Sequence, residues 1–143
     1  ILELTPDDAQ IHYQRGIFFI QEATSAALQD SIGLLDSLAN AKPNDKAAQQ
    51  AKQDLLEYRL GLYQKAMPDF RAAALIDSND VDFQYWYGTS AYFSDDLEAA
   101  QRIYERCVAL DENHKDCWCG LELVYARLKL PKKYEEAKVK CEE

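Results

Sequence analysis

The side chains best suited to chemistry in this chain are four cysteines and two histidines. His114, Cys117 and Cys119 are close in sequence and are residue types that bind zinc. On a helix, however, residues two apart do not face each other, so Cys117 and Cys119 cannot reach one ion unless the helix unwinds. We therefore predict no metal site and interpret the cysteines as small buried side chains with free thiols. A disulfide from Cys107 to Cys117 or to Cys141 would join neighbouring helices.

Catalytic sets and cofactor loops are missing from the sequence. His12 and His114 are far apart, and no nucleophile, base and orienting residue form a recognisable set. No glycine-rich phosphate loop is present. The carboxylates gather at turns and helix starts, where capping explains them. The sequence predicts a protein that is not an enzyme and that needs no cofactor.

Charge narrows the range of partners. The 143 residues carry 16 Lys and Arg against 25 Asp and Glu, a net charge of −9. Binding to nucleic acid requires a basic footprint, and an anionic membrane surface also repels an acidic chain. No apolar run approaches the roughly 18 residues of a membrane span. We expect protein partners, no nucleic acid and no direct membrane insertion. Free thiols would favour the cytoplasm over a periplasmic or organellar location.

Residues 81–114 form the unit that organises the chain. An aromatic first helix ends at Ser94, Asp95 and Asp96, whose short polar side chains can cap a second helix. The second helix carries apolar residues at spacings of three and four, which places them on one face. These are Leu97, Ala100, Ile103, Tyr104, Cys107 and Leu110.

The same pattern occurs 34 residues earlier. Tyr92, Ala100 and Tyr104 match Tyr58, Ala66 and Phe70, while Cys107, Asp111 and Asn113 match Ala73, Asp77 and Asn79. A helical repeat of this period indicates a solenoid. The chain is predicted to be one domain, residues 1–143, cut from a longer protein, with approximate repeats at 9–45, 46–80, 81–114 and 115–143, the last incomplete.

The remaining helices follow from apolar stripes and breaks. Residues 1–8 are interpreted as the tail of an earlier helix, and helices are predicted at about 8–24 and 27–40. A stop at 42–45 precedes a helix over 46–60, a turn at Gly61 and a partner helix over 63–75, with Pro68 in its first turn. Further helices are predicted over 116–128 and from 134 onward.

This pattern resembles the tetratricopeptide repeat (TPR) family. The last unit supplies Trp118, Leu121 and Tyr125 at motif positions 4, 7 and 11. The central unit supplies Gly88, Ala100, Tyr104 and Cys107 at positions 8, 20, 24 and 27, and the preceding unit supplies Ala66, Phe70 and Ala73 at 20, 24 and 27. The first unit supplies Gly16 and Phe19 at positions 8 and 11, then Pro43 at 32. The helix over 46–60 departs from the motif and matches few of its positions.

The resemblance implies an all-α fold, a right-handed superhelical solenoid of antiparallel helix pairs whose first helices line a concave face. Projected onto this sequence, that partner-binding groove consists of Tyr13, Gln14, Ile17, Lys52, Arg59, Trp86, Phe93, Leu123 and Arg127. The alternative interpretation is core packing for the aromatic residues and plain solvation for the cations. A partner suited to the groove would carry apolar anchors and an acidic group.

Some TPR domains hold a chaperone's terminal carboxylate in a clamp of basic and amide side chains. The corresponding positions here are Tyr13, Ile17, Lys52, Asp82 and Trp86. One is basic and Asp82 would repel a carboxylate, so that clamp is predicted to be absent. Pentatricopeptide repeats have a similar period and bind RNA, but the acidic balance disfavours them.

The predicted function is therefore a protein–protein interaction scaffold that binds a peptide or helix of a partner protein in its concave groove. The alternative is a structural or oligomerisation segment of a larger assembly, such as a secretion, envelope or organelle-assembly factor. There the exposed ends of the solenoid would stack on further repeats.

Overall fold

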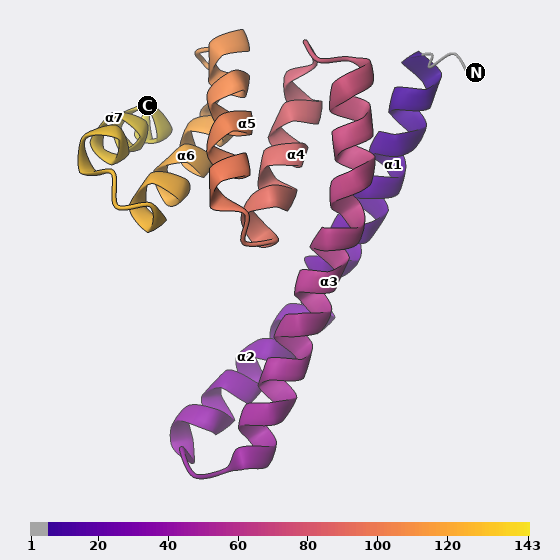
Figure 1. The fold of residues 1–143 in the computed structure, drawn as a ribbon. Helices are drawn as coiled ribbons and strands as arrows, with labels where there is room; N and C mark the ends of the chain where they lie inside the picture. The colour runs from indigo at the N-terminus through magenta and orange to yellow at the C-terminus, as the bar shows by residue number, and fades with distance from the viewer. Residues whose placement is uncertain (1–5) are drawn as a thin grey trace.

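The computed structural model describes residues 6–143, and over that range the chain is helical with no strand (Figure 1). The helices are α1 (Pro6–Ala23), α2 (Ala26–Ala41), α3 (Lys46–Ile76), α4 (Val81–Phe93), α5 (Leu97–Leu110), α6 (Lys115–Arg127) and α7 (Pro131–Glu142). The all-α prediction is confirmed. Residues 1–5, which hold most of the predicted tail of an earlier helix, lie outside the described part. No described helix is long and apolar enough to cross a membrane.

Side-chain caps fix where most helices begin. The carboxylates of Asp45, Asp80 and Asp96 accept hydrogen bonds from backbone N–H groups in the first turns of α3, α4 and α5. Ser25 does the same for α2, and the His114 ring does so for α6. Free N–H groups at a helix start need such partners, so the polar clusters between helices specify the breaks.

Helix α3 runs for 31 residues through both Gly61 and Pro68, so the turn predicted at Gly61 is wrong. Leu62, Tyr63 and Phe70 are buried on one side of α3, and an uninterrupted helix keeps them in a single stripe. That burial outweighs the cost of about 1 kcal/mol for a glycine inside a helix. Pro68 is exposed, so the carbonyl that its ring leaves unbonded can face solvent.

The first half of the molecule is a long antiparallel hairpin. Helix α1 packs along the second half of α3, and α2 packs along the first half, as Figure 1 shows. The two helices predicted at 8–24 and 27–40 are thus both present, but each packs on α3 rather than on the other. We call α2 together with residues 46–60 the arm.

A glycine and an aromatic ring meet at the crossing of α1 and α3. A Cβ atom added at Gly16 would be 2.6 Å from the ring of Phe70, so only glycine allows this approach. Gly88 meets Tyr104 in the same way where α4 crosses α5. Phe70 follows Gly16 by 54 positions in the sequence, whereas Tyr104 follows Gly88 by only 16. The arm is therefore extra chain between two helices that pack like a single TPR-type unit, which explains why residues 46–60 match the motif poorly.

Helices α4 to α7 form two further antiparallel pairs beside this hairpin (Figure 1). Tyr104 lies at their centre, between Gly88 of α4 and Gly120 of α6, and its hydroxyl is 2.7 Å from the Thr89 hydroxyl. Burial raises the pKa of the Tyr104 phenol well above its usual value. Ala100, which the sequence places on the apolar face of the second helix of its unit, is fully buried. The predicted solenoid of antiparallel helix pairs is confirmed.

Two disulfides join the last three helices. Cys107 of α5 is bonded to Cys117 of α6, and Cys119 of α6 is bonded to Cys141 of α7. The prediction of free thiols is wrong, and of the two disulfides considered for Cys107 the one to Cys117 is present. Cys117 and Cys119 point to different sides of α6, so each faces a different neighbouring helix. The different directions of these two side chains exclude one zinc ion shared by both and allow each cysteine to form its own disulfide.

Candidate binding surface

Part of the predicted groove comes together where α3, the end of α4 and the end of α6 meet. The rings of Tyr63 and Phe93 are stacked with centroids 4.5 Å apart, and Tyr92 meets Phe93 edge-on at 5.1 Å. The Arg127 guanidinium lies 5.4 Å from the centre of the Tyr92 ring. Arg59 lies one helical turn before Tyr63 and acts electrostatically on its phenol. We call these five residues the elbow surface.

The two arginines of the elbow surface differ in their charge partners. Arg127 is 2.6 Å from the carboxylate of Asp95, which raises the pKa of the guanidinium. Asp95 has a φ of 66° in the turn between α4 and α5, a conformation that Asp tolerates better than most residues. Arg59, by contrast, has no carboxylate within ion-pair distance among the described residues. The elbow surface therefore has one neutralised and one unneutralised cation.

Burial also affects the aromatic part of the elbow surface. Tyr63 is buried, and this raises the pKa of its phenol, an effect that the positive charge of Arg59 partly opposes. Phe93 stacks on that buried ring while 42% of its own surface stays exposed. Leu123 is also exposed and lies one turn before Arg127 on α6, so it extends the same face. An exposed apolar edge supported by a buried ring is a suitable anchor for a partner side chain.

Three other predicted groove residues pack between α1, α3 and α4. Trp86 stacks on the fully buried ring of Phe70 at 6.0 Å, and Tyr13 lies 6.1 Å from the same ring. Ile17 packs against the same cluster. All three side chains are half-buried, so each contributes to helix packing and retains an exposed part.

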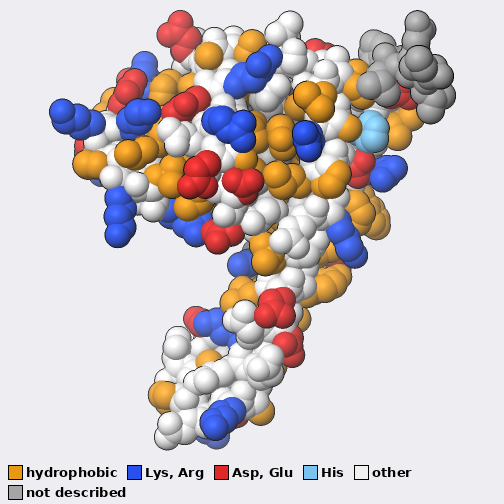
Figure 2. Space-filling model, in the orientation of Figure 1, with side chains coloured by type: hydrophobic (Ala, Val, Ile, Leu, Met, Phe, Trp, Pro, Cys, Tyr) orange, Lys and Arg blue, Asp and Glu red, His pale blue; other side chains and the backbone are white. Residues whose placement is uncertain are grey.

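The last two predicted residues lie apart from these groups. Lys52 is on the arm, where its ammonium group is 2.6 Å from Asp36 of α2. Gln14 lines a shallow apolar hollow formed by α1 alone, beside Ile11 and Phe18. The face of the arm visible in Figure 2 shows less hydrophobic colour than the body above it, although Leu34, Leu38 and Tyr58 are exposed on the arm. Lys52 and Gln14 therefore do not join the elbow surface.

Sequence reasoning missed Tyr63 and Tyr92, two of the five elbow residues. Tyr63 was placed at the start of a separate helix, which hid its position one turn after Arg59. The unbroken apolar stripe from Leu55 through Leu62 to Phe70 was the available signal that α3 continues. For Tyr92 the sequence shows a repeat match, and the projection of the TPR motif places its neighbour Phe93 in the groove instead.

A buried ionic cluster between α1 and α3 was also missed. Asp69 is 4% exposed, and its carboxylate is 2.9 Å from Nδ1 of His12 and 3.4 Å from Nε of Arg15. Such a buried carboxylate needs partners, and these two supply them. His12 is thus paired with Asp69, whereas Nδ1 of His114 accepts a hydrogen bond from the backbone N–H of Cys117.

One group of described residues brings metal-binding side chains together: Cys107, His114 and Cys117. Their ligand atoms all lie within 4.8 Å of one another. This set differs from the one considered in the sequence, because Cys107 of α5 takes the place of Cys119. The two cysteines of the set are joined as a disulfide in this structure.

No protein-family model and no curated protein matches this sequence. Solved structures of MamA, a TPR-like protein, match its fold. "Crystal structure of MamA" has a TM-score of 0.54 at 21% identity and covers 85% of this chain and 70% of that chain. "MamA RS-1 ArsTM double mutant" has a TM-score of 0.55 at 22% identity, covering 94% and 73%. "Crystal structure of MamA protein" has a TM-score of 0.54 at 20% identity, covering 96% and 73%. The likeness shows a TPR-type helical repeat fold.

Proposed function

We propose that this chain is a protein-interaction scaffold that holds a peptide or helix of a partner protein, with the elbow surface as the main contact. The observation that carries the proposal is the exposed edge of Phe93, which stacks on buried Tyr63. Arg59 acts electrostatically on Tyr63, and the Arg127 guanidinium lies over the neighbouring Tyr92 ring. Aromatic and arginine side chains are the types that most often dominate binding energy at protein interfaces.

The charges of the elbow surface suggest what the partner carries. An apolar side chain would cover Phe93, and an acidic group would pair with Arg59, which lacks a carboxylate partner within the described chain. Arg127 already forms an ion pair with Asp95, so an acidic group of the partner would have to compete with the Asp95 carboxylate to bind it. The partner is therefore a protein segment with apolar anchors and at least one acidic residue. The chaperone-type carboxylate clamp is not part of this proposal.

The experiment starts from a displayed library of random peptides selected on the intact chain. Fluorescence anisotropy then measures the affinity of a selected peptide for Phe93→Ala. We expect a loss of about 30-fold or more, since truncating an interface hot spot costs about 2 kcal/mol or more. The matched control is Phe18→Ala, which removes an equally large exposed ring from α1.

Arg59→Gln should weaken binding of the same peptide at low salt and less at high salt, because the charge of a partly exposed cation is screened. Selected peptides that bind both phenylalanine variants as tightly as the wild type would contradict the proposal. Peptides that lose affinity only for Phe18→Ala would place binding on α1 instead.

A second candidate function is stacking through the open end of the helical repeat. It is favoured by Ile11 and Phe18, which are 59% and 68% exposed on one face of α1. An apolar face left uncovered at the end of a repeat array can pack on further repeats. Sedimentation equilibrium of the wild type and of the Ile11→Asp, Phe18→Asp double variant tests this idea. Self-association that the double variant abolishes would support it, and a monomer at high concentration would not.

A further inference from the structure

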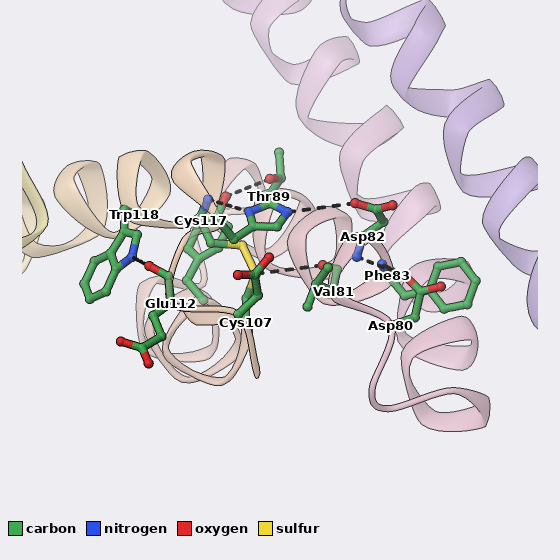
Figure 3. Close-up of a disulfide and its surroundings, with 12 residues drawn as sticks. Asp80, Val81, Asp82, Phe83, Thr89, Cys107, Glu112, Cys117 and Trp118 are labelled. Atoms are coloured by element: carbon green, nitrogen blue, oxygen red, sulfur yellow. Dashed lines mark hydrogen bonds and ion pairs between the residues drawn. A yellow bond between two sulfur atoms is a disulfide. The ribbon is translucent and has the colours of Figure 1, made fainter. Parts of the chain in front are cut away.

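The cluster of Cys107, His114 and Cys117 lies where α5 ends and α6 begins. Both cysteines are fully buried, and the His114 side chain is 13% exposed. Figure 3 shows Cys107 and Cys117 joined by their disulfide, with Asp82 of α4 in the same close-up. Three soft or borderline ligand atoms within 4.8 Å of one another match the requirements of a zinc ion.

The imidazole of His114 lies close to both cysteines, and zinc would take the Nδ1 lone pair that now accepts a backbone hydrogen bond. Its Nδ1 atom accepts a hydrogen bond from the backbone N–H of Cys117 at 3.2 Å and so faces the first turn of α6. Its Nε2 atom faces the Asp82 carboxylate of α4 at 3.8 Å. Metal-bound imidazoles commonly direct their second nitrogen to a carboxylate, which fixes the ring and strengthens the ligand.

We propose that, once the Cys107–Cys117 disulfide is reduced, its two thiolates and Nδ1 of His114 bind one Zn²⁺ ion. Asp82 acts as the carboxylate behind the imidazole. A dithiol reductant supplies two electrons and two protons, converting the disulfide to two thiols while it becomes a disulfide itself. The zinc ion then replaces both thiol protons, which are released to solvent. The fourth coordination position is left to water or to an outside ligand.

The backbone around this pair can accommodate the change. The Cα atoms of Cys107 and Cys117 are 6.3 Å apart, towards the wide end of the range for bonded cysteines. Two thiolates about 2.3 Å from one zinc ion lie roughly 3.8 Å from each other in a tetrahedral site. Cys117 also lies in the first turn of α6, where the helix dipole favours negative charge on its sulfur.

The second cysteine pair provides an internal control. Cys119 and Cys141 have Cα atoms 4.7 Å apart, and they belong to no ligand cluster found in residues 6–143. After reduction, this pair offers two sulfurs but no imidazole. The inference therefore predicts that zinc distinguishes between two cysteine pairs of the same small protein. It does not rest on the proposed binding function.

The test uses the full chain reduced with a phosphine under anaerobic conditions. Co²⁺ serves as a spectroscopic stand-in for Zn²⁺, and a chromophoric chelator competes for the zinc. We expect one metal ion per chain, with a sulfur-to-cobalt charge-transfer band and the visible bands of tetrahedral cobalt. The Cys119→Ser, Cys141→Ser double variant should keep this signal, and Cys107→Ser should lose it.

His114→Asn removes the imidazole and keeps a side chain that caps helices well, so it separates ligation from folding. It should abolish tetrahedral cobalt binding while circular dichroism stays unchanged. Asp82→Asn should weaken zinc binding by about 10- to 100-fold, the usual effect of losing such a carboxylate. A cobalt signal that survives His114→Asn, or that depends on Cys119 and Cys141, would overturn the proposal.

Thiol alkylation of the wild type gives a readout that needs no variant. Mass spectrometry should find that zinc slows the alkylation of Cys107 and Cys117 in the reduced protein relative to the zinc-free protein, while Cys119 and Cys141 react at the same rate with and without zinc. Equal modification of all four cysteines with and without zinc would contradict the site.

Discussion

Gly120→Ala tests the central crossing of the solenoid. A Cβ atom at this position would be 2.5 Å from the ring of Tyr104. The ring cannot move away easily, because Gly88 packs closely on it as well and the Thr89 hydroxyl holds its phenol at 2.7 Å. Forcing an extra methyl group into such a packed site costs about 1–3 kcal/mol.

The free-energy cost of overpacking at Gly120 is best measured against a matched variant. Gly61 also lies inside a helix, but a Cβ atom there would meet nothing within 4 Å. Replacing a helical glycine with alanine stabilises a helix by up to about 1 kcal/mol, and both variants gain this equally. The difference in unfolding free energy between Gly61→Ala and Gly120→Ala therefore isolates the overpacking, roughly 1–3 kcal/mol.

Urea denaturation followed by circular dichroism supplies both free energies. We expect Gly61→Ala to be as stable as the wild type or more stable, and Gly120→Ala to be less stable. Equal stability of the two variants would show that Tyr104 does not fill the space between α4 and α6, and the reasoning about that crossing would fail.

Three further predictions concern stability. The Cys119→Ser, Cys141→Ser double variant should lose about 3 kcal/mol of unfolding free energy in urea, because its unfolded chain is no longer constrained across 22 residues. Alkaline pH should destabilise the wild type, because burial raises the pKa of Tyr104 in the folded state. The contribution of the neutral Tyr104 phenol to the free energy of unfolding is fully present below the pKa of an unfolded tyrosine, near 10, and is lost as the pH rises above it. Tyr104→Phe should show a shallower loss above pH 10 in thermal melts. Ala100→Leu should cost about 1–3 kcal/mol because the site is fully buried, and an unchanged melting temperature would contradict this.

The repeat itself could be predicted because it rests on periodic contacts. Alanine at 66 and 100 and an aromatic ring at 70 and 104 recur at one spacing. Both alanines are fully buried, and each ring meets a glycine of a neighbouring helix. Helix ends could be predicted for a similar reason, as Asp80 and Asp96 cap the backbone within a few residues of themselves. Such local and periodic requirements leave clear traces in one sequence.

For α3, two sequence signals conflict: the apolar stripe from Leu55 to Phe70 indicates one helix, whereas local breakers indicate a turn. Gly61 and Pro68 usually mark breaks, and only burial against α1 and α2 keeps the helix intact through them. The arm also depends on this continuity, because residues 46–60 extend away from α1 only as the first half of an unbroken α3. The elbow surface depends on α3 passing straight from Arg59 to Tyr63, so its composition could be only partly predicted. The Cys119–Cys141 bridge depends on where α7 packs, which spacing alone does not reveal.

Photocrosslinking tests the proposed binding surface most directly. Benzoylphenylalanine placed at position 93 reports what lies against the exposed edge of that ring, and the same group at position 18 samples the exposed face of α1. With a peptide selected on the intact chain, we predict crosslinks from position 93 and none from position 18. Crosslinks from position 18 alone would contradict binding at the elbow surface.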